Sequence, residues 1–285
     1  MTKIFNSIVD LEIELKEVRG NCEIIAFVPT MGALHQGHLQ LVKEAQKIAD
    51  KVVMSIFVNP TQFNDKNDLD KYPKTLDADI KLVQTVGLDY LYVPDETEIY
   101  PPEKIVELEL NLLHYDQVME GAFRPGHFKG VCQVVKRLLD LVDPHILVMG
   151  QKDFQQYSII QFMIDQLLLP IRLHVVNTKR DSRGLALSSR NMRLSESGRI
   201  KAATIFRTMK TIKSKIKLEG ISFLESYGFN RLKRAGFEPE YVSIVDGSDL
   251  KNITSIHGTK YAVICVAAWL EKVRLIDNMV LFDER

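Results

Sequence analysis

The sequence has few cysteines and no long apolar run, and each of these absences excludes a class of protein. Its cysteines, Cys22, Cys132 and Cys265, are scattered and match neither a disulfide framework nor a metal-binding spacing. They favour a reducing compartment in which thiols pack as small apolar side chains, so we expect a cytoplasmic protein. No apolar run approaches the roughly 20 residues that a membrane-spanning helix needs, so we expect no membrane partner.

The balance of charges narrows the range of partners further. Lysine plus arginine and aspartate plus glutamate number 37 each, so the chain has no net charge that would attract nucleic acid. The chain is 46% hydrophobic, which is typical of a globular protein, and its 285 residues are enough for two domains. Residues 1–18 lack the long apolar core of a signal peptide and predict an amphipathic helix.

The most informative stretch is residues 23–46, EIIAFVPTMGALHQGHLQLVKEAQ. A short apolar run ending in proline is typical of a buried strand, and the apolar residues that follow recur at helical spacing. The turn between them contains Gly32 and two histidines, His35 and His38, which can point to one side of the first helical turn. Because N–H groups at a helix N-terminus favour anions, the turn predicts a phosphate-binding site.

This histidine pair also has simpler interpretations. A histidine near a helix start is commonly a capping or surface residue, and His-x-x-His can form half of a metal site. No third ligand lies nearby at a typical metal spacing, which favours phosphate over metal. The motif alone leaves a phosphate site and an ordinary helix start equally open.

Apolar periodicity predicts the other elements. Strands are expected at 24–28, 52–58, 88–93, 145–149 and 171–176, with an edge strand at 105–110. Helices are expected at 1–18, 131–142 and 154–168, together with one helix that begins at residue 39 and another that ends at about residue 86. Further on we expect a long helix over 195–218, a capping box at Ser222 and Glu225, and strands at 240–245, 261–267 and 273–281. Alternating strands and helices predict an α/β fold with a parallel sheet, and a change of composition predicts a domain boundary near residue 185.

Polar residues follow two of the predicted strands directly. Asn59 and Gln62 come after one strand, and Lys152 and Asp153 come after another. The carboxyl ends of parallel strands meet at one edge of the sheet, where ligands bind, so we expect these residues on the same rim as the histidine pair. Taken singly, Asn-Pro is better explained as a turn and a lone lysine as a solvated side chain.

Two further segments carry candidate functional side chains. Residues 120–130 predict a glycine-rich loop that contains Arg124, His127 and Lys129. Residues 178–191, TKRDSRGLALSSRN, hold the densest basic cluster of the chain, which consists of Lys179, Arg180, Arg183 and Arg190.

Together these segments resemble the pantothenate synthetase (pantoate–β-alanine ligase) family of the His-x-Gly-His nucleotidyltransferase superfamily. The matching pieces are PTMGALHQGH (29–38), SIFVNPTQF (55–63), YPKT (72–75), EGAFRPGHFKGV (120–131), GQKDFQQ (150–156), LALSSRN (185–191) and VAAWLEKVRLIDN (266–278). They span nearly the whole chain in the family's order. The His-x-Gly-His motif by itself is less specific, because class I aminoacyl-tRNA synthetases share it.

The resemblance implies a Rossmann-like, doubly wound parallel sheet in a nucleotide- and pantoate-binding domain at 1–184, and a smaller C-terminal α+β lid domain at 185–285. It also implies a homodimer and a two-step reaction that needs ATP and Mg²⁺. The pantoate carboxylate attacks the α-phosphorus of ATP and expels pyrophosphate. The amine of β-alanine then attacks pantoyl adenylate, which gives pantothenate and AMP.

The resemblance also implies roles for individual residues. His35, His38 and Lys152 would be catalytic, with both imidazoles donating to phosphate oxygens and the lysine neutralising charge on the α-phosphate. The remaining ATP contacts would be Met31, Gly32, Gly150, Gln151, Asp153, Lys179, Leu187, Ser188, Ser189 and Arg190. Pantoate or β-alanine would contact Asn59, Gln62, Tyr72 and Gln156, and Asp79 is the candidate for the magnesium shell.

Two other functions remain open on the sequence. A tRNA-charging enzyme shares the histidine motif, but the neutral charge and the lack of an anticodon-binding domain argue against it. A catalytically silent nucleotide-binding scaffold is the second, although every rim motif retains its chemical side chains. A tRNA shift assay and an assay of AMP release would separate these functions from the ligase.

Overall fold

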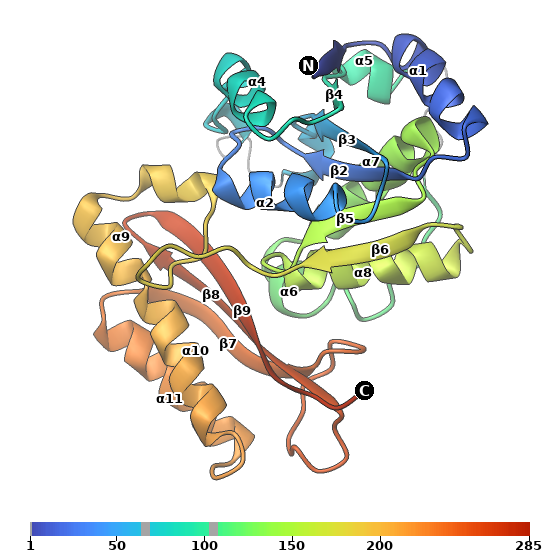
Figure 1. The fold of residues 1–285 in the computed structure, drawn as a ribbon. Coiled ribbons are helices and arrows are strands. Elements are labelled where there is room, and N and C mark those ends of the chain that lie inside the picture. Colours follow the sequence, from blue (N-terminus) through green and yellow to red (C-terminus); the bar gives the residue numbers. More distant parts are fainter. Residues whose placement is uncertain (1, 64–68, 103–107) are drawn as a thin grey trace. The chain divides into compact units, whose positions relative to one another are not determined.

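The structure, a computed structural model, describes residues 2–63, 69–102 and 108–285, and Figure 1 shows its fold. Contacts between residues divide the chain into two compact units. Unit 1 consists of Met1–Leu112, Arg124–Gly150 and Ile159–Val176, and unit 2 of Leu113–Phe123, Gln151–Ser158 and Asn177–Arg285. Unit 2 therefore contains two short segments from the middle of the chain in addition to the C-terminal part.

Unit 1 is built on a parallel sheet of six strands in the order β1-β4-β3-β2-β5-β6. The strands are β1 Lys3–Phe5, β2 Ile25–Thr30, β3 Lys51–Ile56, β4 Tyr90–Tyr92, β5 Ile146–Gly150 and β6 Arg172–Val176. The central strands are almost continuously apolar because parallel strands of this kind are covered on both faces. The predicted parallel α/β sheet is confirmed.

Helices connect these strands and cover the sheet. They are α1 Ile8–Gly20, α2 Gln36–Ala45, η1 Pro60–Gln62, α4 Leu76–Gln84, α5 Glu96–Ile99, α7 His127–Val142 and α8 Phe154–Gln166, whose first turn belongs to unit 2. Alternate sheet residues such as Val28 and Met54 pack in one cluster with Val42 of α2 and Val83 of α4. The intervening Phe27 is also fully buried, and α7 contacts both β2 and α1. Helices therefore lie on both faces, as in a doubly wound fold.

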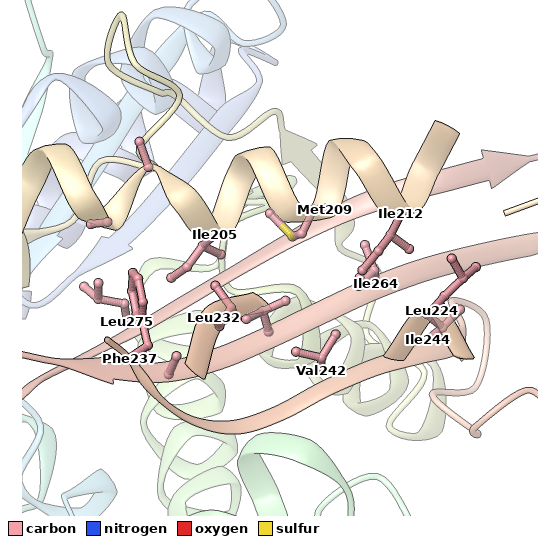
Figure 2. Close-up of a cluster of buried hydrophobic side chains, with 14 of the residues drawn as sticks. Ile205, Met209, Ile212, Leu224, Leu232, Phe237, Val242, Ile244, Ile264 and Leu275 are labelled. Carbon is pink, nitrogen blue, oxygen red and sulfur yellow. The ribbon is translucent and has the colours of Figure 1, made fainter. Parts of the chain in front are cut away.

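Unit 2 is built on an antiparallel sheet of three strands, β7-β8-β9. Its elements are α6 Met119–Phe123, η2 Ser189–Arg193, α9 Glu196–Ala202, α10 Thr204–Lys215, α11 Ile221–Arg234, β7 Glu238–Asp246, β8 Tyr261–Leu270 and β9 Val273–Asp283. Figure 2 shows Ile205, Met209 and Ile212 of α10 pointing toward the sheet, where they join Ile244 and Ile264 in one buried cluster. This cluster is the core of the C-terminal α+β unit.

The opposite face of the small sheet is covered by the two short segments that unit 2 takes from the middle of the chain. Val263 and Cys265 of β8 pack there with Met119 of α6 and Phe154 of α8. Strand β8 is therefore buried on both faces, which explains its long apolar run. Burial also raises the pKa of the Cys265 thiol well above its usual value, so this cysteine acts as a small apolar residue.

Several predicted elements are corrected by the structure. The N-terminal helix begins at Ile8 rather than at residue 1, because Lys3–Phe5 pairs with β4 as an edge strand. Residues 120–130 were expected to be a loop, but α6 and the first turn of α7 lie there. The expected edge strand at 105–110 falls partly on residues 105–107, which lie outside the described residues, and Leu108–Leu110 forms no strand.

Two predictions about helices in unit 2 are also wrong. The expected helix over 195–218 is divided into α9 and α10 at Ala203, without a glycine or proline to signal the break. Ser222 does not cap α11, because the helix begins earlier, at Ile221, with Gly220 as its N-cap. Glu225 instead accepts a hydrogen bond of 2.7 Å from the backbone N–H of Ile244.

Within the described ranges, no helix combines the length and the apolar character needed to cross a bilayer.

Candidate active site

The predicted histidine pair lies in the turn between β2 and the first residues of α2. His35 is the N-cap of the helix, and its Nδ1 accepts from the Gly37 backbone N–H at 3.1 Å. His38 Nδ1 accepts from the His35 backbone N–H at 3.2 Å, and the two rings stack with centroids 4.1 Å apart. Because Nδ1 is an acceptor in both rings, each neutral imidazole carries its hydrogen on Nε2. The turn thus presents two oriented Nε2–H donors.

Asp79 of α4 holds this turn in its conformation. Its Oδ2 accepts from the backbone N–H of Ala33 at 2.9 Å, and its Oδ1 accepts from the N–H of Leu34 at 2.8 Å and from Thr75 Oγ1 at 3.1 Å. Gly32 and Ala33 both have positive φ, +79° and +48°, which is uncommon for alanine. The buried Asp79 carboxylate therefore stabilises a strained turn directly before the histidine pair.

Gln62 is anchored by the loop that follows β3. Asn59, which is 1% exposed, donates through Nδ2 to Gln62 Oε1 and to the carbonyl of Gly130, both at 3.2 Å. Its Oδ1 accepts from Tyr100 Oη at 2.8 Å and from Thr61 Oγ1 at 3.0 Å. The amide of Asn59 is therefore occupied within the protein, where it orients Gln62. Direct contact between Asn59 and a substrate stays a prediction.

His127 supports Gln62 from the other side. Arg124 can only donate, so its Nη1, at 3.1 Å, makes His127 Nε2 an acceptor and leaves the ring hydrogen on Nδ1. That Nδ1–H donates to the carbonyl of Gln62 at 2.8 Å. At Gly130 in α7, a Cβ would lie 2.5 Å from the carbonyl oxygen of Thr61, so only glycine permits this approach of helix and loop. The sequence motif RPGHFKG therefore packs against the Gln62 loop.

Unit 2 contains a cavity that brings together predicted phosphate-binding residues from separate parts of the chain. Lys152, Ser188 and Arg190 line it, together with Arg274 and Asp277 of β9. Lys152 Nζ lies 3.5 Å from the half-exposed Asp153 carboxylate, so this ion pair is weak. Ser188 caps η2 by accepting from the Arg190 N–H at 3.3 Å. Cationic and hydroxyl side chains therefore line one cavity, in which Arg274 is already paired with Glu120 and Glu240.

The basic cluster at 179–190 does not act as one patch. Arg180 forms a bidentate ion pair with the buried Asp277 at 2.5 and 2.9 Å, and its guanidinium lies 4.3 Å from the ring centroid of Phe206. Burial raises the pKa of Asp277, while Arg180 acts in the opposite direction. Arg180 is therefore structural, whereas Lys179 is exposed and Arg190 reaches the cavity.

The other predicted site residues are distributed between the two units. Met31 Sδ lies 3.0 Å from Gln62 Nε2, and the Tyr72 ring packs edge-on against Phe63. Gly150 ends β5 in unit 1, whereas Gln151, Asp153, Gln156, Leu187 and Ser189 belong to unit 2. Within unit 1 the structure brings Met31 together with Gln62 and Asn59, and within unit 2 it brings Lys152 together with Ser188 and Arg190.

Sequence reasoning missed several residues that support the site. Gln155, rather than Gln156, is buried, and it bonds the Glu120 N–H and the carbonyls of Tyr115 and Val118. Asp277 and Asn278 of β9 contact the segments that carry the cavity residues. The only sequence signal for these residues was that they lie in GQKDFQQ and VAAWLEKVRLIDN, two of the segments that match the family. The resemblance implied no role for them.

Comparison with known proteins decides the family. A family profile described as pantoate-beta-alanine ligase matches residues 3–280. The chain belongs to this family. Among curated relatives named pantothenate synthetase, that of Phocaeicola vulgatus is 45% identical over 280 residues, covering 97% of this chain and 98% of the relative. That of Azobacteroides pseudotrichonymphae is 42% identical over 279 residues, covering 97% and 99%.

Solved structures of the pantoate–β-alanine ligase family share the fold. A pantothenate synthetase from Thermus thermophilus has a TM-score of 0.89 at 34% identity, covering 99% of this chain and 100% of that one. A pantoate–β-alanine ligase from Francisella tularensis, described as complexed with beta-gamma ATP and beta-alanine, has a TM-score of 0.80 at 32% identity. This match covers 99% of this chain and 98% of the other. The likeness thus extends over both units.

Proposed function

We propose that this protein condenses (R)-pantoate with β-alanine at the expense of ATP, giving pantothenate, AMP and pyrophosphate through a pantoyl-adenylate intermediate. The observation that carries the proposal is the family match over residues 3–280, which includes both units and every motif discussed above. In the first step a pantoate carboxylate oxygen bonds to the α-phosphorus, and the bond from that phosphorus to the β-phosphate bridging oxygen breaks. In the second step the amine of β-alanine attacks the acyl carbon and AMP leaves, while the nitrogen loses a proton.

The histidine pair would act on phosphate oxygens during the first step. Both Nδ1 atoms are occupied by backbone N–H groups, so the donors are the Nε2–H groups of His35 and His38. Donors held in place before the reaction stabilise developing charge without a cost of reorganisation. Asp79 would contribute indirectly, by holding Ala33 and Leu34 in the turn that fixes the histidines.

Lys152, Ser188 and Arg190 would bind the phosphates of the same ATP. Phosphoryl transfer depends mainly on positioning and on neutralising charge, and the unit 2 cavity supplies a lysine and an arginine for both purposes. Lys152 would take the α-phosphate, and Ser188, Ser189 and Arg190 the β- and γ-phosphates. The backbone near Lys179 would contact adenine.

Magnesium would enter as part of the substrate, bound to the triphosphate. Mg²⁺ is commonly held by substrate phosphates with only one or two protein carboxylates, so it needs no protein cage. Asp79 was the predicted protein ligand, but three hydrogen bonds occupy its two oxygens. This arrangement fits an anchor for the turn better than a place in the magnesium shell, and contact with the metal stays a prediction.

Pantoate would be bound by Gln62, with Gln156 and Tyr72 as further contacts. Replacing Gln62 by leucine keeps the approximate volume but removes the amide that Asn59 orients. We expect the dissociation constant for pantoate to rise by roughly 10–200-fold, because polar groups of the site and the substrate lose their partner. Binding of ATP should remain unchanged in calorimetric titration.

The exposed Gln84 of α4 provides the matched control for this measurement. Gln84→Leu makes the same chemical change at the surface of the same unit and should leave both affinities unchanged. Loss of ATP affinity in Gln62→Leu, with pantoate affinity retained, would assign Gln62 to the nucleotide.

Product analysis tests the proposed reaction. Incubation with ATP, pantoate, β-alanine and Mg²⁺ should yield pantothenate, AMP and pyrophosphate in equal amounts. An ADP-forming ligase would pass through an acyl phosphate and release ADP and phosphate, which would contradict the adenylate route even if pantothenate formed.

Three finer features of the proposal concern the protein as a whole. A homodimer is proposed from the family resemblance, and a cytoplasmic location from the three cysteines that match no disulfide framework. The division into a nucleotide- and pantoate-binding domain at 1–184 and a lid at 185–285 stays a prediction. Sedimentation of the purified protein tests the first of these features.

A further inference from the structure

Two adjacent residues of β9, Asp277 and Asn278, are buried polar side chains that no step above uses. They are 6% and 3% exposed. Burying an amide and a carboxylate costs free energy, a buried ion pair commonly adds little net stability, and the buried Asn278 Oδ1 has no hydrogen-bond partner among the described residues. Their contacts therefore point to a role in positioning.

Asn278 holds the backbone of the loop that carries Lys152. Its Nδ2 donates to the carbonyl of Gln151 and to the carbonyl of Lys152, both at 2.8 Å. The two hydrogens of the Asn278 amide therefore bind the carbonyls of two consecutive residues. This fixes the orientation of the peptide groups on either side of the Lys152 Cα, and hence the direction in which the lysine side chain leaves the backbone.

Asp277 holds the segment that leads to Ser188 and Arg190. Its carboxylate binds the Arg180 guanidinium, which also donates to the carbonyl of Gly184 at 3.2 Å. Arg180 pairs in addition with Ala186 through a β-bridge, so the ion pair sets the position of the whole turn from 180 to 186. Only one residue separates this turn from Ser188.

The two contacts are coupled to each other. The Asn278 N–H donates to Asp277 Oδ1 at 2.8 Å, and Arg180 Nη2 lies 3.3 Å from the Asn278 carbonyl. One dipeptide on a rigid strand therefore holds both chain segments that supply Lys152, Ser188 and Arg190 to the unit 2 cavity.

We propose that Asp277 and Asn278 are positioning residues for adenylate formation, which fix Lys152 and the Ser188–Arg190 segment on the same triphosphate. This inference rests on the role proposed for Lys152. Neither residue is assigned a contact with a reacting atom. Asn278 acts through the Lys152 backbone, and Asp277 acts through Arg180.

The test is a double-mutant cycle measured by pantoate-dependent exchange of pyrophosphate into ATP. Asn278→Ala should lower the exchange rate constant by about 10–100-fold, the range in which a displacement of about 1 Å in a catalytic group is felt. The KM for pantoate should not change. In a Lys152→Ala background, Asn278→Ala should cause little further loss, because the group that it positions is already absent.

A matched charge variant separates positioning from folding. Asn278→Asp places carboxylate oxygens against the carbonyls of Gln151 and Lys152 and should impair exchange at least as much as Asn278→Ala. Asn252 is exposed in the same unit, and Asn252→Asp should have no effect. If Asn278→Asp fails to fold, the double-mutant cycle of Asn278→Ala with Lys152→Ala still distinguishes positioning from misfolding. Misfolding caused by Asn278→Ala would reduce exchange by the same factor in the wild-type and in the Lys152→Ala background.

The outcomes separate this inference from the proposed function. Equal losses from Asn278→Ala with and without Lys152, or normal exchange in Asn278→Ala, would overturn the positioning role and leave the role of Lys152 intact. Normal exchange in Lys152→Ala would overturn both. A loss that is large in the wild-type background and small in the Lys152→Ala background, with an unchanged pantoate KM, supports the inference.

Discussion

Replacing Lys152 by alanine should slow pantoate-dependent adenylate formation by about 10²–10³-fold, the usual loss when one preorganised electrostatic donor is removed. Lys152 lines the unit 2 cavity with Ser188 and Arg190, and its side chain is only 17% exposed. In such a partly desolvated place a positive charge interacts strongly with the charge that develops on the α-phosphate. Single-turnover measurement of pyrophosphate release in the presence of ATP and pantoate gives this rate directly.

Two companion variants sharpen this result. Lys152→Arg keeps the positive charge but changes the shape of the donor, so it should recover part of the lost rate and less than all of it. Lys217 is exposed between α10 and α11, and Lys217→Ala should react at the normal rate. Near-normal turnover in Lys152→Ala, with the fold verified by circular dichroism, would remove Lys152 from the mechanism.

Replacing His38 by alanine should also reduce adenylate formation by about 10²–10³-fold. This substitution removes two functions at once, because His38 Nδ1 accepts from the His35 N–H at the start of α2 while Nε2–H is the proposed donor to phosphate. Loss of the capping interaction alone should cost about 1 kcal/mol of stability, which thermal unfolding would detect. The rate loss should exceed what that destabilisation explains.

His38→Asn separates the two functions. An asparagine Oδ1 can accept the His35 N–H in place of Nδ1, but no donor remains at the Nε2 position. We therefore expect stability close to wild type together with the low rate of His38→Ala. The exposed His257 serves as control, since His257→Ala should have the normal rate. A fast His38→Asn variant would mean that His38 is needed for capping alone.

The part of the site that could be predicted from sequence is local. The turn from β2 into α2 contains its own signals, because the proline, Gly32 and the two histidines lie within ten residues of each other. The parallel sheet then follows from the alternation of apolar strands and helices, and it places polar residues at strand ends on one rim. Within unit 1, the positions of His35, His38 and Gln62 after β2 and β3 depend on this logic.

The contacts that support the site could not be predicted, because they join residues that are distant in sequence. Asp79 anchors backbone groups at 33 and 34, and Asn278 binds carbonyls at 151 and 152. An aspartate on an amphipathic helix and an asparagine in a strand carry no signal of such partners until the chain is folded. Arg180 shows the same limit, since the sequence shows only its place in a basic cluster, whereas the structure pairs it with Asp277.

The errors in secondary structure have related causes. The segment at 120–130 contains three glycines and a proline, which favour a loop, yet Gly130 is needed where α7 packs closely against the Gln62 loop. Ser222 and Glu225 have the spacing of a capping box, but Glu225 is used by the backbone of β7 instead. In both places a tertiary contact outweighs the local preference.

The central claim is that the protein activates pantoate as an adenylate before β-alanine takes part, and isotope exchange tests it most directly. With ATP, Mg²⁺ and labelled pyrophosphate, but without β-alanine, label should enter ATP only when pantoate is present. The exchange rate should fall by about 10²–10³-fold in Lys152→Ala and in His38→Asn, while Lys217→Ala retains the normal rate. Absence of pantoate-dependent exchange in a protein that still makes pantothenate would contradict the account.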